Sequence, residues 1–205
     1  MYTGIVQALL PVETVERKPG LMTFSIRLPA ELLPELTLGA SVAINGTCFT
    51  VTTIDADQVW FDAIAETLAI TNISELTVGS LVNVERSAKA DAEIGGHILS
   101  GHIIGTAPVA EITDSENNRR LTFEGDPAWM KYVFTKGFLA LNGASLTIAA
   151  VDGDKFSVNL IPETMKRTNF GLMQMGDRVN VEIDQQTQAV VDTVERVMAE
   201  RFPAS

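Results

Sequence analysis

The chain has 205 residues, of which 15 are basic and 26 acidic, giving a formal net charge of −11 at pH 7. This balance excludes a surface that binds nucleic acid or an anionic membrane, because such a surface needs an excess of lysine and arginine. Cys48 is the only cysteine, so no disulfide can form within the chain. With no secretory leader and no apolar run of membrane-spanning length, a cytoplasmic protein is expected.

The sequence contains an internal repeat at a spacing of 97 residues, since residues 43–51 return as residues 140–148. A period near 100 residues is the size of a small domain and too long for a solenoid unit. The matches include small polar residues as well as turn glycines and core residues, so each half is expected to build a similar pocket. The expected parts are a first domain at 1–97, a second at 98–185 and a C-terminal helix with its tail at 186–205.

Each half contains the same predicted elements in the same order. A short helical stretch comes first, at 29–36 and again at 127–134. An Asn-Gly pair follows, at 45–46 and 142–143, and predicts a tight β-hairpin because both residues tolerate positive φ. The alternating runs after it predict strands at 48–54, 59–64, 145–151 and 156–161. Short strands at such regular spacing indicate a closed all-β barrel in each half.

The only long helical pattern runs from about residue 186 to 201 and has no counterpart in the first half. Val190, Val194, Val197 and Met198 share one face of it, while Asp192 and Arg196 form an i,i+4 pair on another. The apolar face either packs back on its own barrel or forms a short seam between subunits.

Four side chains are candidates for chemistry. His97 and His102 are the only histidines, and their spacing suits neither one helix face nor one strand face. No acidic or cysteine cluster accompanies them, so no metal site is expected. Cys48 and Ser145 occupy the same place in the two halves, and each is either a small core residue or a reactive group. No nucleophile elbow surrounds Ser145, which argues against serine-hydrolase chemistry.

The repeated threonines are either sheet residues or pocket donors, and the repeated glutamates are either surface charges or ligands for sugar hydroxyls. These pairs are Thr50 with Thr147, Thr67 with Thr164, and Glu66 with Glu163. No phosphate-binding loop, dinucleotide motif or zinc spacing occurs, so no cofactor is expected. Two matched pockets with unequal polar groups suit two copies of one ligand in different roles.

Several motifs are recognisable in order along the chain. They are Met1-Tyr2-Thr3-Gly4-Ile5-Val6, Gly95-Gly96-His97 with Ser100-Gly101-His102, Asn142-Gly143-Ala144-Ser145-Leu146-Thr147, Ile161-Pro162-Glu163-Thr164 and the tail at 188–196. Together they resemble the signatures of riboflavin synthases of the trimeric alpha-chain type, especially the gammaproteobacterial form. The resemblance extends from Met1 to about Arg201.

The resemblance implies two six-stranded Greek-key barrels and a homotrimer held mainly by the C-terminal helices. It implies that two molecules of 6,7-dimethyl-8-ribityllumazine disproportionate, with transfer of a four-carbon unit, to riboflavin and 5-amino-6-ribitylaminouracil. No cofactor is needed for this reaction. Association with lumazine synthase, the enzyme that forms the substrate, is left open.

The resemblance also implies one lumazine site in each barrel, with the N-terminal site of one subunit facing the C-terminal site of a neighbour. The expected N-terminal site comprises Gly4, Ile5, Val6, Cys48, Phe49, Thr50, Asp62, Ala63, Ile64, Ala65, Glu66 and Thr67. The expected C-terminal site comprises Gly101, His102, Ile103, Lys136, Ser145, Leu146, Thr147, Leu160, Ile161, Pro162, Glu163, Thr164 and Met165.

The reaction requires removal of a proton from the 7-methyl group of one lumazine and activation of the other ring. An imidazole titrates near neutral pH and is suited to moving that proton. We expect His102 to do so, assisted by Ser145 and Thr147, and Cys48 to act as nucleophile or polar activator in the facing site. Holding the two rings in the right orientation supplies much of the rate.

Three departures from the family pattern are visible. Tyr2 replaces the usual Phe and keeps its aromatic bulk, so activity is expected to survive. Asn142 stands where Asp is commoner, which removes a carboxylate near Ser145. Thr47 stands where relatives carry a second cysteine, which leaves Cys48 alone.

Two other classes of protein compete with the enzyme. A bioluminescence antenna of the same ancestry would bind a lumazine or flavin without turnover, but it should lack polar groups in one pocket, and both pockets keep theirs. A nucleic-acid-binding barrel would need a basic, aromatic groove, which the composition does not supply.

Overall fold

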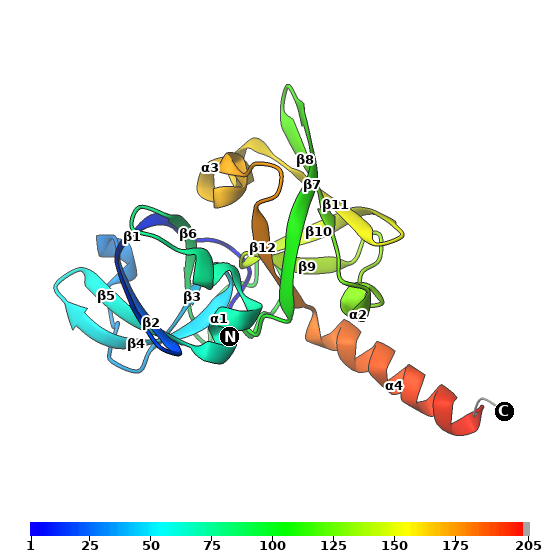
Figure 1. The fold of residues 1–205 in the computed structure, drawn as a ribbon, viewed down its shortest axis with the longest axis horizontal. Helices are drawn as coiled ribbons and strands as arrows, with labels where there is room; N and C mark the ends of the chain where they lie inside the picture. The colour runs from blue at the N-terminus through cyan, green and yellow to red at the C-terminus, as the bar shows by residue number, and fades with distance from the viewer. Residues whose placement is uncertain (203–205) are drawn as a thin grey trace.

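The computed structural model describes residues 1–202, which form two closed barrels of antiparallel strands followed by one long helix (Figure 1). The six strands of the first barrel are hydrogen-bonded in the order β1-β2-β5-β4-β3-β6. They are β1 (Ala8–Lys18), β2 (Leu21–Arg27), β3 (Ser41–Ile44), β4 (Thr47–Asp55), β5 (Gln58–Ile64) and β6 (Leu81–Arg86).

The second barrel repeats the arrangement, with its strands in the order β7-β8-β11-β10-β9-β12 around the ring. They are β7 (Gly105–Ser115), β8 (Asn118–Glu124), β9 (Phe138–Leu141), β10 (Ala144–Asp152), β11 (Lys155–Leu160) and β12 (Arg178–Ile183). The predicted fold, a tandem pair of six-stranded Greek-key barrels with a C-terminal helix, is confirmed.

The two Asn-Gly turns have the backbone conformation that the sequence predicts. Asn45 and Asn142 have φ of 45° and 41°, and Gly46 and Gly143 have φ of 79° and 80°. The two turns also meet between the barrels, where a Cβ on Gly46 would lie 2.5 Å from the Gly143 nitrogen. Glycine is therefore required here by both the backbone conformation and the close approach.

The short helices differ from the prediction. The stretch 29–36 contains only the 3₁₀ turn η1 (Ala30–Leu32), because Pro34 cannot continue a helix and Glu35 has φ of 60°. The stretch 127–134 shortens to α2 (Pro127–Met130). Four further short helices were not predicted, since one or two turns leave no clear periodicity. They are α1 (Ala65–Ile70), η2 (Asn72–Glu75), α3 (Pro162–Arg167) and η3 (Asn169–Leu172).

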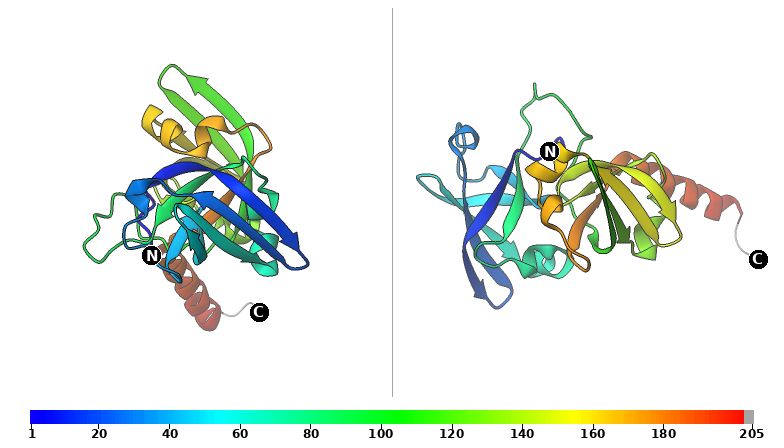
Figure 2. Two further views of the ribbon diagram at one scale, coloured as in Figure 1. Left: turned by 90° about the vertical axis from the view of Figure 1, so that its left-hand side faces the viewer. Right: turned by 90° about the horizontal axis from the view of Figure 1, so that it is seen from above.

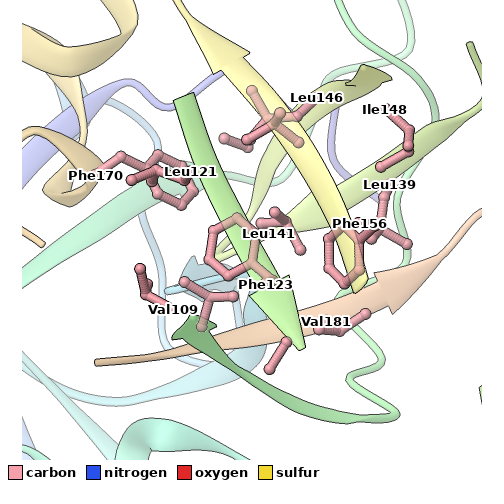
Figure 3. Close-up of a cluster of buried hydrophobic side chains, with 14 of the residues drawn as sticks. Val109, Leu121, Phe123, Leu139, Leu141, Leu146, Ile148, Phe156, Phe170 and Val181 are labelled. Carbon is pink, nitrogen blue, oxygen red and sulfur yellow. The ribbon is translucent and has the colours of Figure 1, made fainter. Parts of the chain in front are cut away.

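Each barrel encloses its own aromatic core. In the first, the ring of Phe24 lies 5.2 Å from that of Phe49 and 5.5 Å from that of Phe61. In the second, Phe123 and Phe156 stack at 5.4 Å among aliphatic side chains (Figure 3). Inward apolar and outward polar residues alternate along the strands, as expected for a barrel that is filled by side chains.

Repeated asparagines join the two barrels. The Asn180 Oδ1 accepts a hydrogen bond from the Asn72 amide at 2.7 Å, and the Asn83 Oδ1 accepts one from the Asn169 amide at 2.8 Å. The Asn83 side chain also donates to the Asn142 carbonyl at 2.9 Å. The repeat predicts that polar residues of this kind line equivalent pockets. These asparagines form hydrogen bonds between the two halves.

The helix α4 (Gln185–Arg201) projects away from both barrels (Figures 1 and 2). Its first turn is capped by Asp184, which accepts a hydrogen bond from the Thr187 amide at 2.9 Å. Val190 and Val194 are 63% and 55% exposed, so the apolar face does not pack back on the protein's own barrel. Within residues 1–202, no helix has the length and apolar character needed to cross a membrane.

Candidate active site

Two extended segments pass each other between the barrels: residues 1–6, which precede the first barrel, and residues 97–103, which precede the second. Tyr2 and Leu99 pair as an antiparallel bridge, with the Tyr2 amide 2.8 Å from the Leu99 carbonyl and the Leu99 amide 3.0 Å from the Tyr2 carbonyl. The two residues are equivalent in the repeat, so the bridge lies where the two halves meet.

A buried glutamate holds each segment. The Glu85 carboxylate accepts hydrogen bonds from the Thr3 amide at 2.6 Å and the Thr3 hydroxyl at 2.8 Å. Its counterpart, Glu182, accepts from the Ser100 amide and hydroxyl, both at 2.7 Å. Burial raises the pKa of both glutamates, and these hydrogen bonds oppose the rise by stabilising the carboxylates.

Beyond this crossing, each segment contacts the barrel of the opposite half. The Ser145 amide, on β10, donates to the Gly4 carbonyl at 2.9 Å, and the Cys48 amide, on β4, donates to the Gly101 carbonyl at 3.0 Å. Val6 is likewise part of the second barrel's core. Within one chain, the segment of Gly4 therefore lies beside Ser145 and the segment of Gly101 lies beside Cys48, opposite to the expected grouping by position in the sequence.

Both contacts between a segment and the opposite barrel depend on glycine. Gly4 and Gly101 have φ of 74° and 80°. A Cβ on Gly4 would lie 2.6 Å from the Ser145 Cβ, and one on Gly101 would lie 2.6 Å from the Cys48 Cβ. A third position, Gly96, also has no room for a side chain, because an added Cβ would lie 2.5 Å from the Ser145 Cβ. The backbone can approach these two side chains only without side chains of its own.

A cavity of about 330 Å³ opens where the first segment meets β10 and α3. It combines apolar walls with hydroxyl and charged groups. Its lining residues are Gly4, Ile5, Val6, Ala144, Ser145, Leu146, Glu163, Thr164, Arg167 and Thr168. The Arg167 guanidinium pairs with the Glu163 carboxylate at its edge. A pocket of this kind suits a ring with a polar chain attached.

His97, rather than His102, is the partner of Ser145 within the chain. The His97 Nδ1 lies 2.6 Å from the Ser145 hydroxyl, and its ring stacks on Phe138 with centroids 5.5 Å apart. Burial lowers the pKa of His97, although the nearby carboxylate of Asp184 opposes the shift. The imidazole is therefore neutral at neutral pH and able to accept a proton.

Cys48 has a different partner. The Tyr2 hydroxyl donates to its sulfur at 3.0 Å, and Tyr2 itself is buried in a small cluster between the barrels. His102 follows Gly101 on the same side, with an exposed side chain. The expected assistance of His102 by Ser145 and Thr147 is not found within one chain, where the preceding residue, Gly101, contacts Cys48 instead.

The other expected residues fall into three groups. Some are exposed or partly exposed and do not line the cavity: Thr50, Asp62, Ile64, Ala65, Glu66, Thr67, Thr147, Ile161, Pro162 and Met165. Phe49, Ala63 and Leu160 have their side chains in the barrel cores, and Ile103 is also buried. Lys136, expected to reach into the C-terminal site, is exposed and does not line the cavity of its own chain.

The sequence prediction missed the roles of His97, Arg167 and the two glutamates. Glu85 and Glu182 belong to the repeated Val-Asn-Val-Glu motif, so the repeat carried a signal for them. His97 has no counterpart in the first half, and the repeat therefore gave no signal for it. No group of three or more histidine, cysteine or acidic side chains in residues 1–202 is placed to hold a metal ion.

Comparisons with known proteins identify the family of each half and of the whole chain. Residues 3–87 and 100–184 each match the model of the lumazine binding domain. The riboflavin synthase of Escherichia coli strain K12 is 53% identical over 98% of this chain and 95% of its own length. That of Chlamydia pneumoniae is 42% identical, covering 97% of this chain and 98% of its own.

Among solved structures, LumP complexed with riboflavin superposes with a TM-score of 0.85 at 27% identity, covering 90% of this chain and all of that one. LumP complexed with 6,7-dimethyl-8-(1′-D-ribityl) lumazine gives a TM-score of 0.82 with the same coverage. The full-length similarity is to the synthases, and the chain belongs to the riboflavin synthase family.

Proposed function

We propose that this chain catalyses the riboflavin synthase reaction. Two molecules of 6,7-dimethyl-8-ribityllumazine react, one gives a four-carbon unit to the other, and riboflavin and 5-amino-6-ribitylaminouracil leave. The observation that carries this proposal is the pair of repeat-related strand positions, Cys48 and Ser145, each approached by a glycine from the opposite half. Matched scaffolds with different reactive groups fit one substrate in two roles.

The C-terminal site uses the cavity beside Ser145. One lumazine lies with its ring near Ser145 and Leu146 and its ribityl chain toward Glu163 and Thr164. His97 is neutral because burial lowers its pKa, so it can take a proton through or beside the Ser145 hydroxyl. In its protonated state it is stabilised by the Asp184 carboxylate. We therefore assign His97 and Ser145 to proton movement at this site.

The N-terminal site lies beside Cys48, with Thr50, Asp62 and the start of α1 along one side and Gly101 to Ile103 along the other. Cys48 is the nucleophile or polar activator here. His102 is exposed in the single chain, and across a subunit boundary it would reach the Ser145 and Thr147 of a neighbour. In this arrangement His102 acts on the substrate across the boundary between two subunits.

We propose that the chain forms a homotrimer, which would complete this arrangement. Several large apolar side chains are exposed on the single chain, including Ile5 at the cavity, Phe138 against His97, and Ile64, Ile98 and Ile161. A further apolar stripe follows α4. Covering the stripe with the same helix from neighbouring chains would bring the N-terminal site of one subunit to the C-terminal site of the next, and would let Lys136 enter a neighbour's site. We propose that each chain divides at 1–97, 98–185 and 186–205, of which residues 203–205 lie outside the described part of the chain.

The test is incubation of the purified, flavin-free protein with 6,7-dimethyl-8-ribityllumazine, followed by chromatography. Riboflavin and the pyrimidine are expected in equal amounts. Tight binding of the lumazine with no riboflavin would instead identify an antenna-type binder, the second candidate, which the likeness to LumP brings forward. Association with lumazine synthase is tested separately, by co-sedimentation of the two purified proteins.

A further inference from the structure

The hydroxyl of Tyr2 donates a hydrogen bond to the sulfur of Cys48 at 3.0 Å. We propose that Tyr2 is a positioning residue that orients the Cys48 thiol and makes it more reactive. The role concerns the N-terminal site and so rests on the proposed function. Because the phenol proton occupies one side of the sulfur, the thiol's own proton is directed away from Tyr2.

The packing around Tyr2 keeps this donor in place. Tyr2 is only 1% exposed and lies in a cluster with Ala43, Leu99 and Ala140. Its backbone amide and carbonyl both hydrogen-bond to Leu99, and a Cβ on Gly101 would come within 3.0 Å of its ring. Burial and these contacts order the ring, so the hydrogen bond to the sulfur costs little further side-chain entropy.

The phenol also stays protonated. Burial raises the pKa of Tyr2, and the hydrogen bond to Cys48 and the carboxylates of Glu85 and Glu182 act in the same direction. Tyr2 is thus a donor at every pH at which an enzyme of this kind works. A hydrogen bond donated to sulfur stabilises the thiolate more than the thiol, and the thiolate is the nucleophile.

The equivalent position in the other half shows that this partner is not a by-product of the repeat. Leu99 is the counterpart of Tyr2 and has no polar group to offer Ser145. The hydrogen-bond partner of Ser145 is His97, at 2.6 Å, which comes two residues before Leu99 in the same segment. The duplication therefore carries two different activating partners: a proton acceptor beside Ser145 and a permanent donor beside Cys48.

The experiment measures alkylation of the folded protein by iodoacetamide as a function of pH, in the parent chain and in Tyr2→Phe. Cys48 is the only cysteine, so all modification reports on it. Tyr2→Phe should be alkylated about threefold more slowly at pH 7, because the sulfur loses the hydrogen bond that orients it for attack. Equal rates at every pH would overturn the proposal.

Tyr132→Phe is the matched control, because it removes the only other tyrosine hydroxyl, which bonds to Asp192 on the surface. It should leave the alkylation profile unchanged. Tyr2→Phe is expected to fold, since it removes one oxygen and keeps the ring that packs against Ala43, Leu99 and Ala140. The S–H stretching band in the Raman spectrum, also assignable to Cys48 alone, should shift in Tyr2→Phe and in no other variant; an unchanged band counts against the hydrogen bond.

A ligand arm separates this inference from the proposed function. Adding 6,7-dimethyl-8-ribityllumazine should slow alkylation in the parent, because Cys48 lies at the N-terminal site. If the lumazine gives no protection while Tyr2→Phe is still alkylated more slowly, Cys48 lies outside the ligand site. That result would overturn the catalytic role of Cys48 and support the Tyr2–Cys48 hydrogen bond.

Discussion

The segment that precedes each barrel packs against the barrel of the other half, an arrangement that we call the exchange. Replacing Gly4 with alanine tests it most directly. Gly4 has φ of 74°, where a side chain costs about 1–2 kcal/mol. The added Cβ would also lie 2.6 Å from the Ser145 Cβ, and relieving such an overlap costs about 1–3 kcal/mol. The segment must move off β10, so the damage falls on the C-terminal site although Gly4 precedes the first barrel.

Gly176→Ala is the matched control. Gly176 has φ of 90°, and a Cβ there would meet nothing within 4 Å, so this variant carries the backbone strain without the overlap. The difference between the two variants isolates the approach to Ser145. An overlap of about 1–3 kcal/mol corresponds to ligand binding about 5- to 150-fold weaker at the C-terminal site.

The assay is titration with riboflavin followed by fluorescence, combined with the protection of Cys48 against alkylation. Gly4→Ala should weaken the binding of one ligand while the other still protects Cys48. Gly101→Ala should give the reverse pattern, because its Cβ would meet the Cys48 Cβ. Loss of Cys48 protection in Gly4→Ala, with normal binding at the other site, would refute the exchange.

Three further predictions follow from the contacts of single residues. His97→Gln should lower turnover by at least about tenfold. In the parent, turnover should fall on the acid side only below pH 6.5, the ordinary pKa of histidine, because burial lowers the pKa of His97 and its neutral form persists to lower pH. Glu85→Gln should lower the free energy of unfolding by about 2 kcal/mol and speed hydrogen exchange at the Thr3 and Gly4 amides, whose acceptor it weakens. Val194→Glu should give monomers by analytical ultracentrifugation, since it places a charge on the exposed apolar stripe of α4; a persisting trimer would contradict that seam.

The barrels were predictable from the sequence because their signals are local. An Asn-Gly turn fixes the hairpin at 45–46 and again at 142–143, and alternation fixes which faces of the following strands are buried. The long helix was predictable for the same reason, since its periodicity spans several turns. One-turn helices such as α1 and α3 leave no such signal, and were found only in the structure.

The exchange could not be predicted, and the cause is the symmetry of the repeat itself. Pairing Gly4 with Cys48 and Gly101 with Ser145 satisfies the 97-residue repeat, but so does pairing Gly4 with Ser145 and Gly101 with Cys48. Only the path of the chain in three dimensions decides between these pairings, and no local pattern in the sequence encodes it. The same symmetry hid His97, because a residue without a counterpart cannot be found by comparing halves.

The exchange also explains how a duplicated protein can hold two different sites. Each site is completed by a segment of the other half, so neither half can form its site alone and the two remain joined. The scaffold positions, Gly4 with Gly101 and Glu85 with Glu182, keep the same contacts in both halves. The groups beside them differ: Ser145 lies next to the proton acceptor His97, and Cys48 lies next to the donor Tyr2. A reaction between two identical molecules needs unequal sites, because one molecule must lose a proton while the other is attacked.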